Sequence, residues 1–174
     1  MSCEACIQVM TDTILKNDEK AIFGLRQLYQ NYGYTQYKMS KFEEYDLYAK
    51  NKDFLISDSV ITFTDTNGKL MALKPDVTLS IIKNHKDGET VKLYYNENVY
   101  RISPKVHRFK EIMQAGLECI GDTDVLDTYE VVELAAKSLA SIAPEAVLDI
   151  SDLGIIESVF NGASLPEEYR GEAL

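Results

Sequence analysis

The chain has 174 residues, 45% of them hydrophobic and 26% charged, with 28 acidic and 18 basic residues and a formal net charge of -10. This composition is typical of a globular protein and excludes a disordered or fibrous chain. The acidic excess argues against nonspecific nucleic-acid binding, which needs many cations to neutralise phosphates. The length fits a single domain over residues 1–174 with a substantial core.

The N-terminal residues favour a cytoplasmic protein. Glu4 and Asp12 stand where a signal peptide would carry basic and then apolar residues, and no apolar run approaches the roughly 20 residues that span a bilayer. We therefore expect no membrane association. Cys3 and Cys6 have the Cys-x-x-Cys spacing of zinc or redox sites, but no second cysteine pair follows. The sequence favours a frayed N-terminal segment over such a site, and no metal site is predicted.

A first helix is predicted after Asn17 and Asp18, which can cap it, and it should end at Gly33 and cover a sheet. Its apolar residues recur at helical spacing: Ala21, Leu25, Leu28 and Tyr32. The next segment, residues 34–48, mixes aromatic and charged side chains, which is typical of an exposed surface that a partner buries. A dimer contact is predicted there, with an irregular surface helix as the alternative.

A tight hairpin is predicted between the apolar runs Val60–Phe63 and Leu70–Leu73, because Asn67 and Gly68 supply the positive backbone angles of its turn. A helix should follow, since Pro75 suits a first helical turn. We expect that helix to run through Leu79, Ile82 and Lys83 towards Gly88. Asp76 and Thr78, at its start, are either capping residues or ligand-binding residues.

The central feature is a second hairpin, Val91–Ser103 and Phe109–Ile120. Alternate residues of a strand point to opposite faces. On the second strand the even positions are mostly polar, namely Arg108, Lys110, Gln114, Gly116 and Glu118, and the odd positions Phe109, Met113, Ala115, Leu117 and Cys119 are apolar. The apolar face is expected to lie on helices, with Cys119 as a reduced thiol. The polar face, joined by Val99, Arg101 and Ser103, is predicted to be a binding floor, with room for a small ligand over Gly116.

The turn of this hairpin is basic in an otherwise acidic chain. It carries Arg101, Lys105, His107, Arg108 and Lys110, with no acid between Asn98 and Lys110. Such a cluster is suited to a phosphate or carboxylate group. The alternative is a solvated basic turn without a ligand.

A long helix should follow, opened by Asp122 and Asp124 and stopped by Pro144. Its predicted apolar face comprises Val125, Tyr129, Val132, Ala136 and Leu139. Ala146–Ile150 is predicted to be a strand and Leu153–Phe160 a short helix, followed by a polar tail.

The order of these segments resembles the histidyl-tRNA synthetases of class II. The resemblance covers Lys16 to Leu165 and rests on the segments LKPDVT, VYR and QAGLECIG and the long helix after them. It implies an α+β fold: an antiparallel class II aminoacyl-tRNA synthetase-like sheet flanked by helices.

The resemblance also assigns roles to residues. Lys74–Thr78 matches the family's Arg-Pro-Glu-Gly-Thr, so that Asp76 and Thr78 stand where an acid and a threonine hold the amino acid. Arg101 matches an arginine that contacts the amino-acid carboxylate and the ATP phosphate, and Arg108 a loop arginine that reaches ATP. Gln114 and Glu118 match the amide and the acid that recognise histidine. The implied histidine site is thus Asp76, Thr78, Arg101, Gln114 and Glu118, and the vestigial ATP site is Arg101 and Arg108.

Three departures from the family pattern point to a non-catalytic relative. The Arg-x-Glu whose glutamate holds adenine is here Arg101-Ile102-Ser103, and Met39-Ser40 replaces the proline of the first motif. The third class II motif and the second histidine-recognition motif have no match before Leu174. We therefore expect impaired adenylate formation, no catalytic residues in this chain, and a chain that is the N-terminal part of a longer protein.

The resemblance implies a regulatory, non-catalytic subunit of ATP phosphoribosyltransferase, which serves the first step of histidine biosynthesis and its inhibition by histidine. Its expected partner is the catalytic subunit, with a homodimer inside a hetero-oligomer. Histidine is then a regulatory ligand, and neither a cofactor nor tRNA is expected. The alternatives are a catalytic-core fragment of a histidyl-tRNA synthetase and an acidic interaction module without a ligand.

Overall fold

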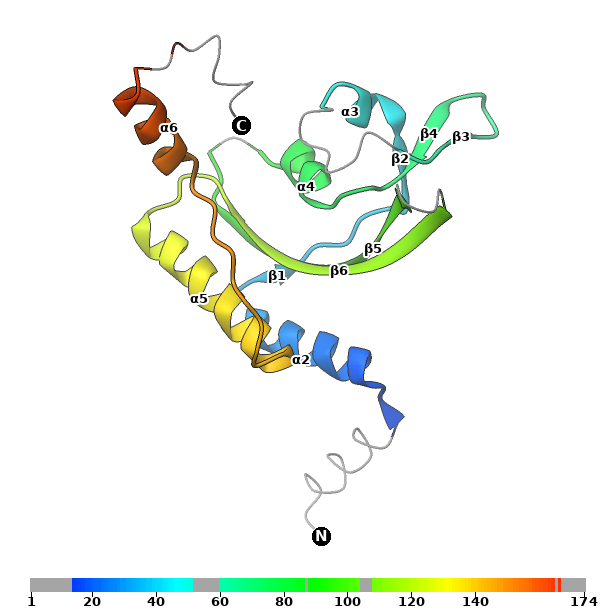
Figure 1. Cartoon of the computed structure of the whole chain (residues 1–174). Helices are drawn as coiled ribbons and strands as arrows, with labels where there is room; N and C mark the ends of the chain where they lie inside the picture. Colours follow the sequence, from blue (N-terminus) through cyan, green and yellow to red (C-terminus); the bar gives the residue numbers. More distant parts are fainter. Residues whose placement is uncertain (1–13, 52–59, 87, 104–107, 165, 167–174) are drawn as a thin grey trace. The chain divides into compact units, whose positions relative to one another are not determined.

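The computed structural model describes residues 14–51, 60–86, 88–103, 108–164 and 166. They fall into two units, one up to Pro144 and one from Glu145, which are described separately. The first unit mixes helices and mainly antiparallel strands (Figure 1). Its helices are α2 (Asn17–Asn31), α3 (Tyr45–Ala49), α4 (Thr78–Asn84) and α5 (Val125–Ile142). Its strands are β1 (Thr35–Gln36), β2 (Phe42–Glu44), β3 (Thr62–Thr64), β4 (Leu70–Leu73), β5 (Val91–Ser103) and β6 (Arg108–Ile120).

The larger sheet has the order β1-β5-β6, in which β1 is parallel and β6 antiparallel to β5. The predicted hairpin is confirmed: β5 has the expected bounds, and β6 begins one residue early, at Arg108. The register places Arg101 opposite Lys110 and Tyr95 opposite Gly116. Among the residues that the structure describes, β6 pairs only with β5 and is therefore an edge of this sheet.

The smaller sheet has the order β2-β4-β3 and is antiparallel throughout. Its β3–β4 hairpin was predicted from Asn67-Gly68, and Gly68 has a φ of 81°. Asp65 supports the turn, because its Oδ1 accepts hydrogen bonds of 2.8 Å from the backbone NH groups of Asn67 and Lys69. β4 has the predicted bounds, whereas β3 begins at Thr62 and leaves Val60 and Ile61 outside the strand.

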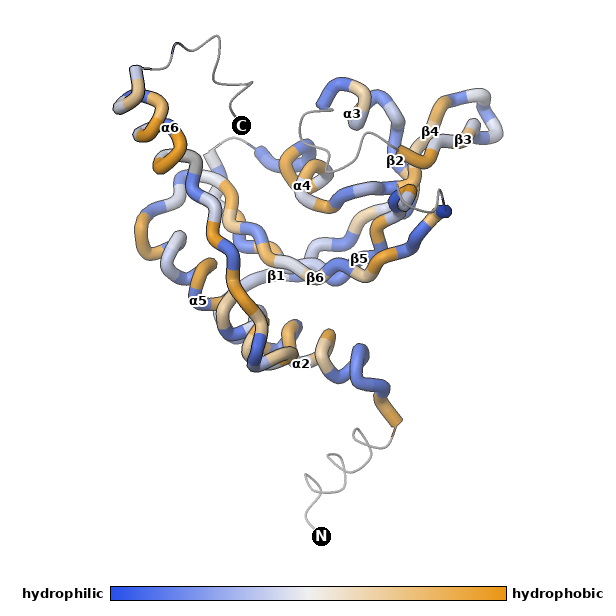
Figure 2. The backbone as a smooth tube through the Cα atoms, in the orientation of Figure 1, coloured by the Kyte–Doolittle hydropathy of each residue, from blue (hydrophilic) through white to orange (hydrophobic). Residues whose placement is uncertain are grey.

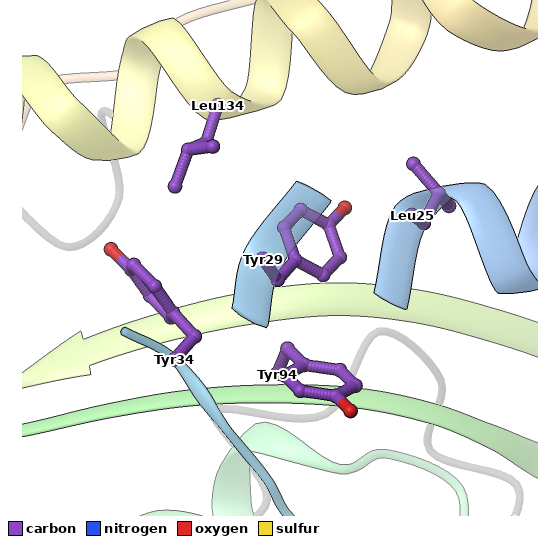
Figure 3. Close-up of a cluster of buried hydrophobic side chains, with 5 residues drawn as sticks. All are labelled: Leu25, Tyr29, Tyr34, Tyr94 and Leu134. Atoms are coloured by element: carbon purple, nitrogen blue, oxygen red, sulfur yellow. The ribbon is translucent and has the colours of Figure 1, made fainter. Parts of the chain in front are cut away.

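Helices α2 and α5 pack on one face of the β5–β6 hairpin, and α4 lies on the other (Figure 1). The core between α2, α5 and the sheet contains Leu25, Tyr29, Tyr34, Tyr94 and Leu134 (Figure 3). The prediction that α2 covers a sheet is thus confirmed. Its predicted caps are wrong, since Asn17 and Asp18 lie inside the first turn and the N-cap is Lys16. The backbone NH of Lys16 donates a 2.9 Å hydrogen bond to Glu19 Oε2 instead.

The predicted apolar face of α5 is largely wrong. Val125 is 82% and Tyr129 65% exposed, whereas Leu134 and Ser138 are buried. The helix carries apolar residues on more than one face, and the row that contains Leu134 meets Tyr29 and Tyr94. The predicted start is confirmed: Asp124 Oδ1 accepts hydrogen bonds from the NH groups of Leu126 and Asp127 at 2.8 and 3.0 Å.

The odd-numbered face of β6 meets helices along only part of its length. Leu117 packs on the α2–α5 core and Cys119 is a half-buried free thiol, as predicted. Phe109 and Met113, however, are 73% and 52% exposed, so the prediction fails at this end of the strand. The packing of α2 and α5 is concentrated around Leu117 and Tyr94.

The aromatic segment 34–48 is not the exposed surface that was predicted, nor an irregular helix. It forms β1, β2 and α3. Tyr34 and Tyr48 are 2% and 1% exposed and belong to cores of this chain. Tyr48 also donates a 2.7 Å hydrogen bond to Glu43 Oε2. Only Phe42 remains as a largely exposed ring, so the aromatic residues of this segment serve mainly the chain's own core.

The second unit contains α6 (Leu153–Gly162), and its start matches the prediction. Asp152 Oδ1 accepts a 3.1 Å hydrogen bond from the backbone NH of Ile155 in the first turn of this helix. This helix is hydrophobic along most of its length (Figure 2). Ala146–Ile150 was predicted to be a strand and is not one. A strand needs a hydrogen-bonded partner, and none of the described strands pairs with these residues. Within the described ranges, every helix is too short or too polar to cross a lipid bilayer.

Candidate ligand-binding site

The predicted floor is the face of the β5–β6 hairpin that carries the even positions of β6. Residues directly opposite each other in an antiparallel pair lie on the same face. The register therefore adds the odd positions of β5 to this face, with Glu97 opposite Gln114 and Leu93 opposite Glu118. Gln114 and Glu118 are four residues apart, which places their Cα atoms about 13 Å from each other. The floor is thus as long as a ligand of amino-acid size.

The segment before α4 closes one side of the floor. Val77 and Ile81 pack against Tyr95 and Val99 in a buried cluster. The backbone is also fixed, because the NH of Tyr100 donates a 2.9 Å hydrogen bond to the carbonyl of Lys74. α4 itself begins at Thr78 rather than at Pro75, and it ends at Asn84, before Gly88. This placement brings Asp76 and Thr78 to the floor.

Arg101 and Gln114 meet at one end of the floor. Arg101 Nε donates a 2.9 Å hydrogen bond to the backbone carbonyl of Pro75. Its Nη2 lies 3.5 Å from Gln114 Oε1, the outer limit of a hydrogen bond. These contacts hold the guanidinium along the strand and, among the described residues, leave its remaining NH groups for an anionic ligand group.

Thr78 and Glu118 meet at the other end. Thr78 Oγ1 donates a 2.6 Å hydrogen bond to Glu118 Oε1. Asp76 caps the first turn of α4 through a 3.1 Å hydrogen bond from the NH of Leu79 to its Oδ1. The two roles that the sequence left open for Asp76 are therefore compatible, since its other oxygen accepts no hydrogen bond within the described part of the chain and is left for a ligand.

The pKa of the Glu118 carboxyl lies above its ordinary value, chiefly because the group is buried and secondly because Asp76 is negatively charged; the hydrogen bond from Thr78 opposes both effects. Burial also raises the pKa of Tyr95 to about 12, with the charge of Glu118 as the next cause. This end of the floor therefore has a negative field and favours a cationic ligand group.

The raised pKa of Glu118 yields a stability prediction. Between the ordinary value of 4.5 and the higher folded value, the unfolded chain gives up this proton first, so ionisation of Glu118 destabilises the fold as pH rises. Glu118→Gln keeps an oxygen for Thr78 and cannot ionise. We expect the variant to gain stability over wild type from pH 4.5 to pH 7, measured by urea unfolding at both values. If the free energy of unfolding of Glu118→Gln differed from that of wild type by the same amount at both pH values, this account would be contradicted.

Not every predicted site residue reaches the floor's centre. Arg108 is exposed at the end of β6, opposite Ser103, and it contacts none of the other predicted site residues through a hydrogen bond of the described structure. Lys105 and His107 of the basic turn, and Cys3 and Cys6, lie outside the described residues. Across the described residues, no group of three His, Cys, Asp or Glu side chains is placed to hold a metal ion.

The space predicted over Gly116 is filled. A Cβ added at this position would lie 2.5 Å from the hydroxyl oxygen of Tyr95. The glycine thus accommodates a tyrosine of the same chain rather than a ligand. Only the pairing of β5 with β6 places Tyr95 opposite Gly116, and the sequence alone does not contain this register.

Three residues of the floor were missed from the sequence: Lys74, Tyr95 and Glu97. Tyr95 and Glu97 share the period-two face of Arg101, so extending that pattern towards the start of β5 would have found them. Lys74 forms an ion pair with Glu97, and their side chains are 1% and 18% exposed. No local pattern indicated a buried lysine, because lysine is rarely buried.

Comparison with known proteins places these residues in a family. The family model for histidyl-tRNA synthetase matches residues 12–174. The chain belongs to the histidyl-tRNA synthetase family. The histidine–tRNA ligase of Methanocaldococcus jannaschii is 31% identical over 150 residues, which cover 83% of this chain and 36% of the ligase. That of Methanococcus vannielii is 29% identical over 150 residues, with the same coverage of 83% and 36%. This histidyl-tRNA synthetase family member thus spans about a third of the length of the curated relatives that it matches.

Solved structures confirm the fold. An ATP phosphoribosyltransferase regulatory subunit/histidyl-tRNA synthetase from Bacillus halodurans has a TM-score of 0.61 and 21% identity, covering 73% of this chain and 34% of that one. A chain of the ATP phosphoribosyl transferase (HisG:HisZ) complex from Thermotoga maritima has a TM-score of 0.65 and 19% identity, covering 88% and 52%. The predicted α+β class II aminoacyl-tRNA synthetase-like fold of this family member is correct.

Proposed function

We propose that the floor of the β5–β6 hairpin binds histidine. The observation that carries this proposal is the separation of charge along the floor. Arg101 lies at one end, and the hydrogen-bonded pair of Thr78 and Glu118 lies at the other, beside Asp76. A zwitterionic amino acid with a basic side chain matches such a floor. Its carboxylate needs hydrogen-bond donors and positive charge, whereas its nitrogen atoms need acceptors and negative charge.

The acidic end suits the amino and imidazole nitrogens. In the described part of the chain, the hydrogen bonds of Glu118 include a hydroxyl and no cationic side chain. A buried carboxylate without a cation is costly, and a ligand nitrogen that donates to it lowers that cost. Gln114, between the two ends, has an amide that can either donate to or accept from the ligand.

We further propose that the protein acts as a regulatory, non-catalytic subunit of ATP phosphoribosyltransferase, with histidine as the inhibitory ligand. Ser103, half-buried and opposite Arg108, stands where the family pattern has a glutamate that holds adenine. A hydroxyl is a weaker acceptor than a carboxylate. ATP would therefore bind poorly through Arg101 and Arg108, while histidine recognition would persist. The catalytic subunit is the proposed partner, in a hetero-oligomer that contains a homodimer of this protein, and no tRNA is needed.

A second candidate function is histidine–tRNA ligation. It is favoured by the curated relatives, because the ligases of Methanocaldococcus jannaschii and Methanococcus vannielii match 83% of this chain. In that case the same floor would present histidine for activation with ATP, and the remaining catalytic groups would come from the part of the ligases beyond the match. Both candidates share the histidine site.

Isothermal titration calorimetry with L-histidine tests the site. We expect binding by wild type, and a dissociation constant at least about tenfold higher for Glu118→Ala, since a hydrogen bond to a charged group is lost. Glu133→Ala is the matched control, because Glu133 pairs with Lys137 on α5, away from the floor. Equal heats for wild type and Glu118→Ala would remove the proposed site and favour an interaction module without a ligand.

Two assays on the full-length protein separate the candidate functions. Histidine-dependent exchange between ATP and pyrophosphate would establish the ligase. Co-purification with a phosphoribosyltransferase catalytic chain, together with no exchange, is the result that we expect for the regulatory subunit.

A further inference from the structure

Tyr95 and Gly116 face each other across the β5–β6 hairpin. Tyr95 is buried, and its ring extends over Gly116. A Cβ at position 116 would lie 2.5 Å from the Tyr95 hydroxyl oxygen and 2.6 Å from its Cζ. Both distances are far shorter than a carbon can tolerate, so the tyrosine ring can lie here only because residue 116 has no side chain.

The hydroxyl of Tyr95 takes part in the polar contacts of the floor. Gln114 Nε2 donates a 3.3 Å hydrogen bond to it, and Gln114 Oε1 faces Arg101. Because a guanidinium can only donate, the amide oxygen must face Arg101 and the amide nitrogen must face Tyr95. The orientation of the Gln114 amide is therefore fixed from both sides. The side chain of Thr78, the partner of Glu118, also acts on the Tyr95 hydroxyl and lowers its pKa against the effect of burial.

We propose that Tyr95 and Gly116 are a matched positioning pair that holds Gln114 in the orientation that the ligand meets. This inference rests on the proposed histidine site and adds to it a residue that acts through other residues. Gln114, the Tyr95 hydroxyl and Glu118 then form a continuous polar row along the floor, in which the tyrosine oxygen occupies the place of the missing Gly116 side chain. Ligand affinity therefore depends on how well the Tyr95 ring fits over Gly116.

Tyr95→Phe isolates the hydroxyl, because the ring and its packing remain. We expect the dissociation constant for histidine to rise about tenfold, with an almost unchanged melting temperature. The side-chain amide NMR signals of Gln114 should shift in the full-length chain without any ligand. Tyr94→Phe is the matched control: its hydroxyl accepts a 3.1 Å hydrogen bond from Gln30 Nε2 on the opposite face, so affinity and the Gln114 signals should not change. Unchanged Gln114 signals in Tyr95→Phe would overturn the proposal.

Gly116→Ala tests the fit itself. The added methyl group must displace the ring, so we expect a lower melting temperature and a dissociation constant raised at least as much as in Tyr95→Phe. In a Tyr95→Leu background the same substitution should lower the melting temperature by less, since the long ring is gone. Gly24→Ala is the control, because nothing lies within 4 Å of the added carbon on α2. If Gly116→Ala lowered the melting temperature equally in the wild-type and the Tyr95→Leu backgrounds, the proposal that Tyr95 and Gly116 are a matched pair would be overturned.

The inference and the proposed function fail in different ways. If wild type does not bind histidine, the proposed function is wrong, and the pair is judged by the Gln114 signals and by the coupling of melting temperatures. If wild type binds histidine and Tyr95→Phe binds it equally well, the site stands and the positioning role of Tyr95 is wrong.

Discussion

Replacing Lys74 with methionine will lower the free energy of unfolding by about 3 kcal/mol, because it leaves a mostly buried carboxylate at Glu97 without its cation. Lys74 is 1% exposed and pairs with Glu97, which is 18% exposed. The loss lies in the lower part of the usual range for such a pair, because Glu97 is partly exposed to water. Urea unfolding at neutral pH measures the change.

A surface pair of the same chemistry provides the control for Lys74→Met. Lys69 Nζ lies 2.6 Å from Glu44 Oε1, and both side chains are about half exposed, 53% and 52%. Lys69→Met should therefore change stability little, because water screens that pair. The double variant Lys74→Met/Glu97→Leu should recover most of the lost stability, since no unpaired charge remains. A loss for Lys74→Met no greater than for Lys69→Met would show that the buried pair does not hold the segment before α4 on β5.

At the proposed histidine site, we expect Arg101→Lys to weaken binding about thirty- to a hundredfold, because lysine keeps the charge but loses the planar fork of donors. The tie to the Pro75 carbonyl and the contact with Gln114 would be lost together. Histamine, which lacks the carboxylate, should bind wild type and Arg101→Lys with similar affinity. Calorimetry with both ligands measures the difference.

The control for Arg101→Lys lies directly across the hairpin. Lys110 is opposite Arg101 in the register and is exposed. Lys110→Ala removes a cation from the same neighbourhood, and we expect its histidine affinity to stay close to that of wild type. If Lys110→Ala and Arg101→Lys weakened binding equally, a general positive field, rather than the geometry of Arg101, would explain the affinity.

Local signals in the sequence were enough for the elements that position the site. Period-two alternation located the β5–β6 hairpin, Asn67-Gly68 located the β3–β4 turn, and Asp124 located the start of α5. Each of these signals depends on backbone preferences of neighbouring residues, which hold whatever the rest of the chain does. The face shared by Arg101, Gln114 and Glu118 followed from alternation, and the structure brings Arg101 to Gln114 and Thr78 to Glu118.

The remaining features depend on contacts between distant segments. Tyr34 and Tyr48 appear in a charged segment of the sequence and are nevertheless core residues, because α2, α5 and β4 surround them. The buried face of α5 was set by its contact with Tyr29 and Tyr94 rather than by its own periodicity. Likewise, the role of Gly116 depends on Tyr95, which the strand register alone brings to it.

β6 lies at the edge of the described β1-β5-β6 sheet. Along its outer side, backbone NH and carbonyl groups have no partner strand among the described residues. A regular strand of 13 residues with such an open side is a template for pairing with another extended chain. Another extended segment, from this protein or from a second molecule, can therefore add to the sheet along this side of β6.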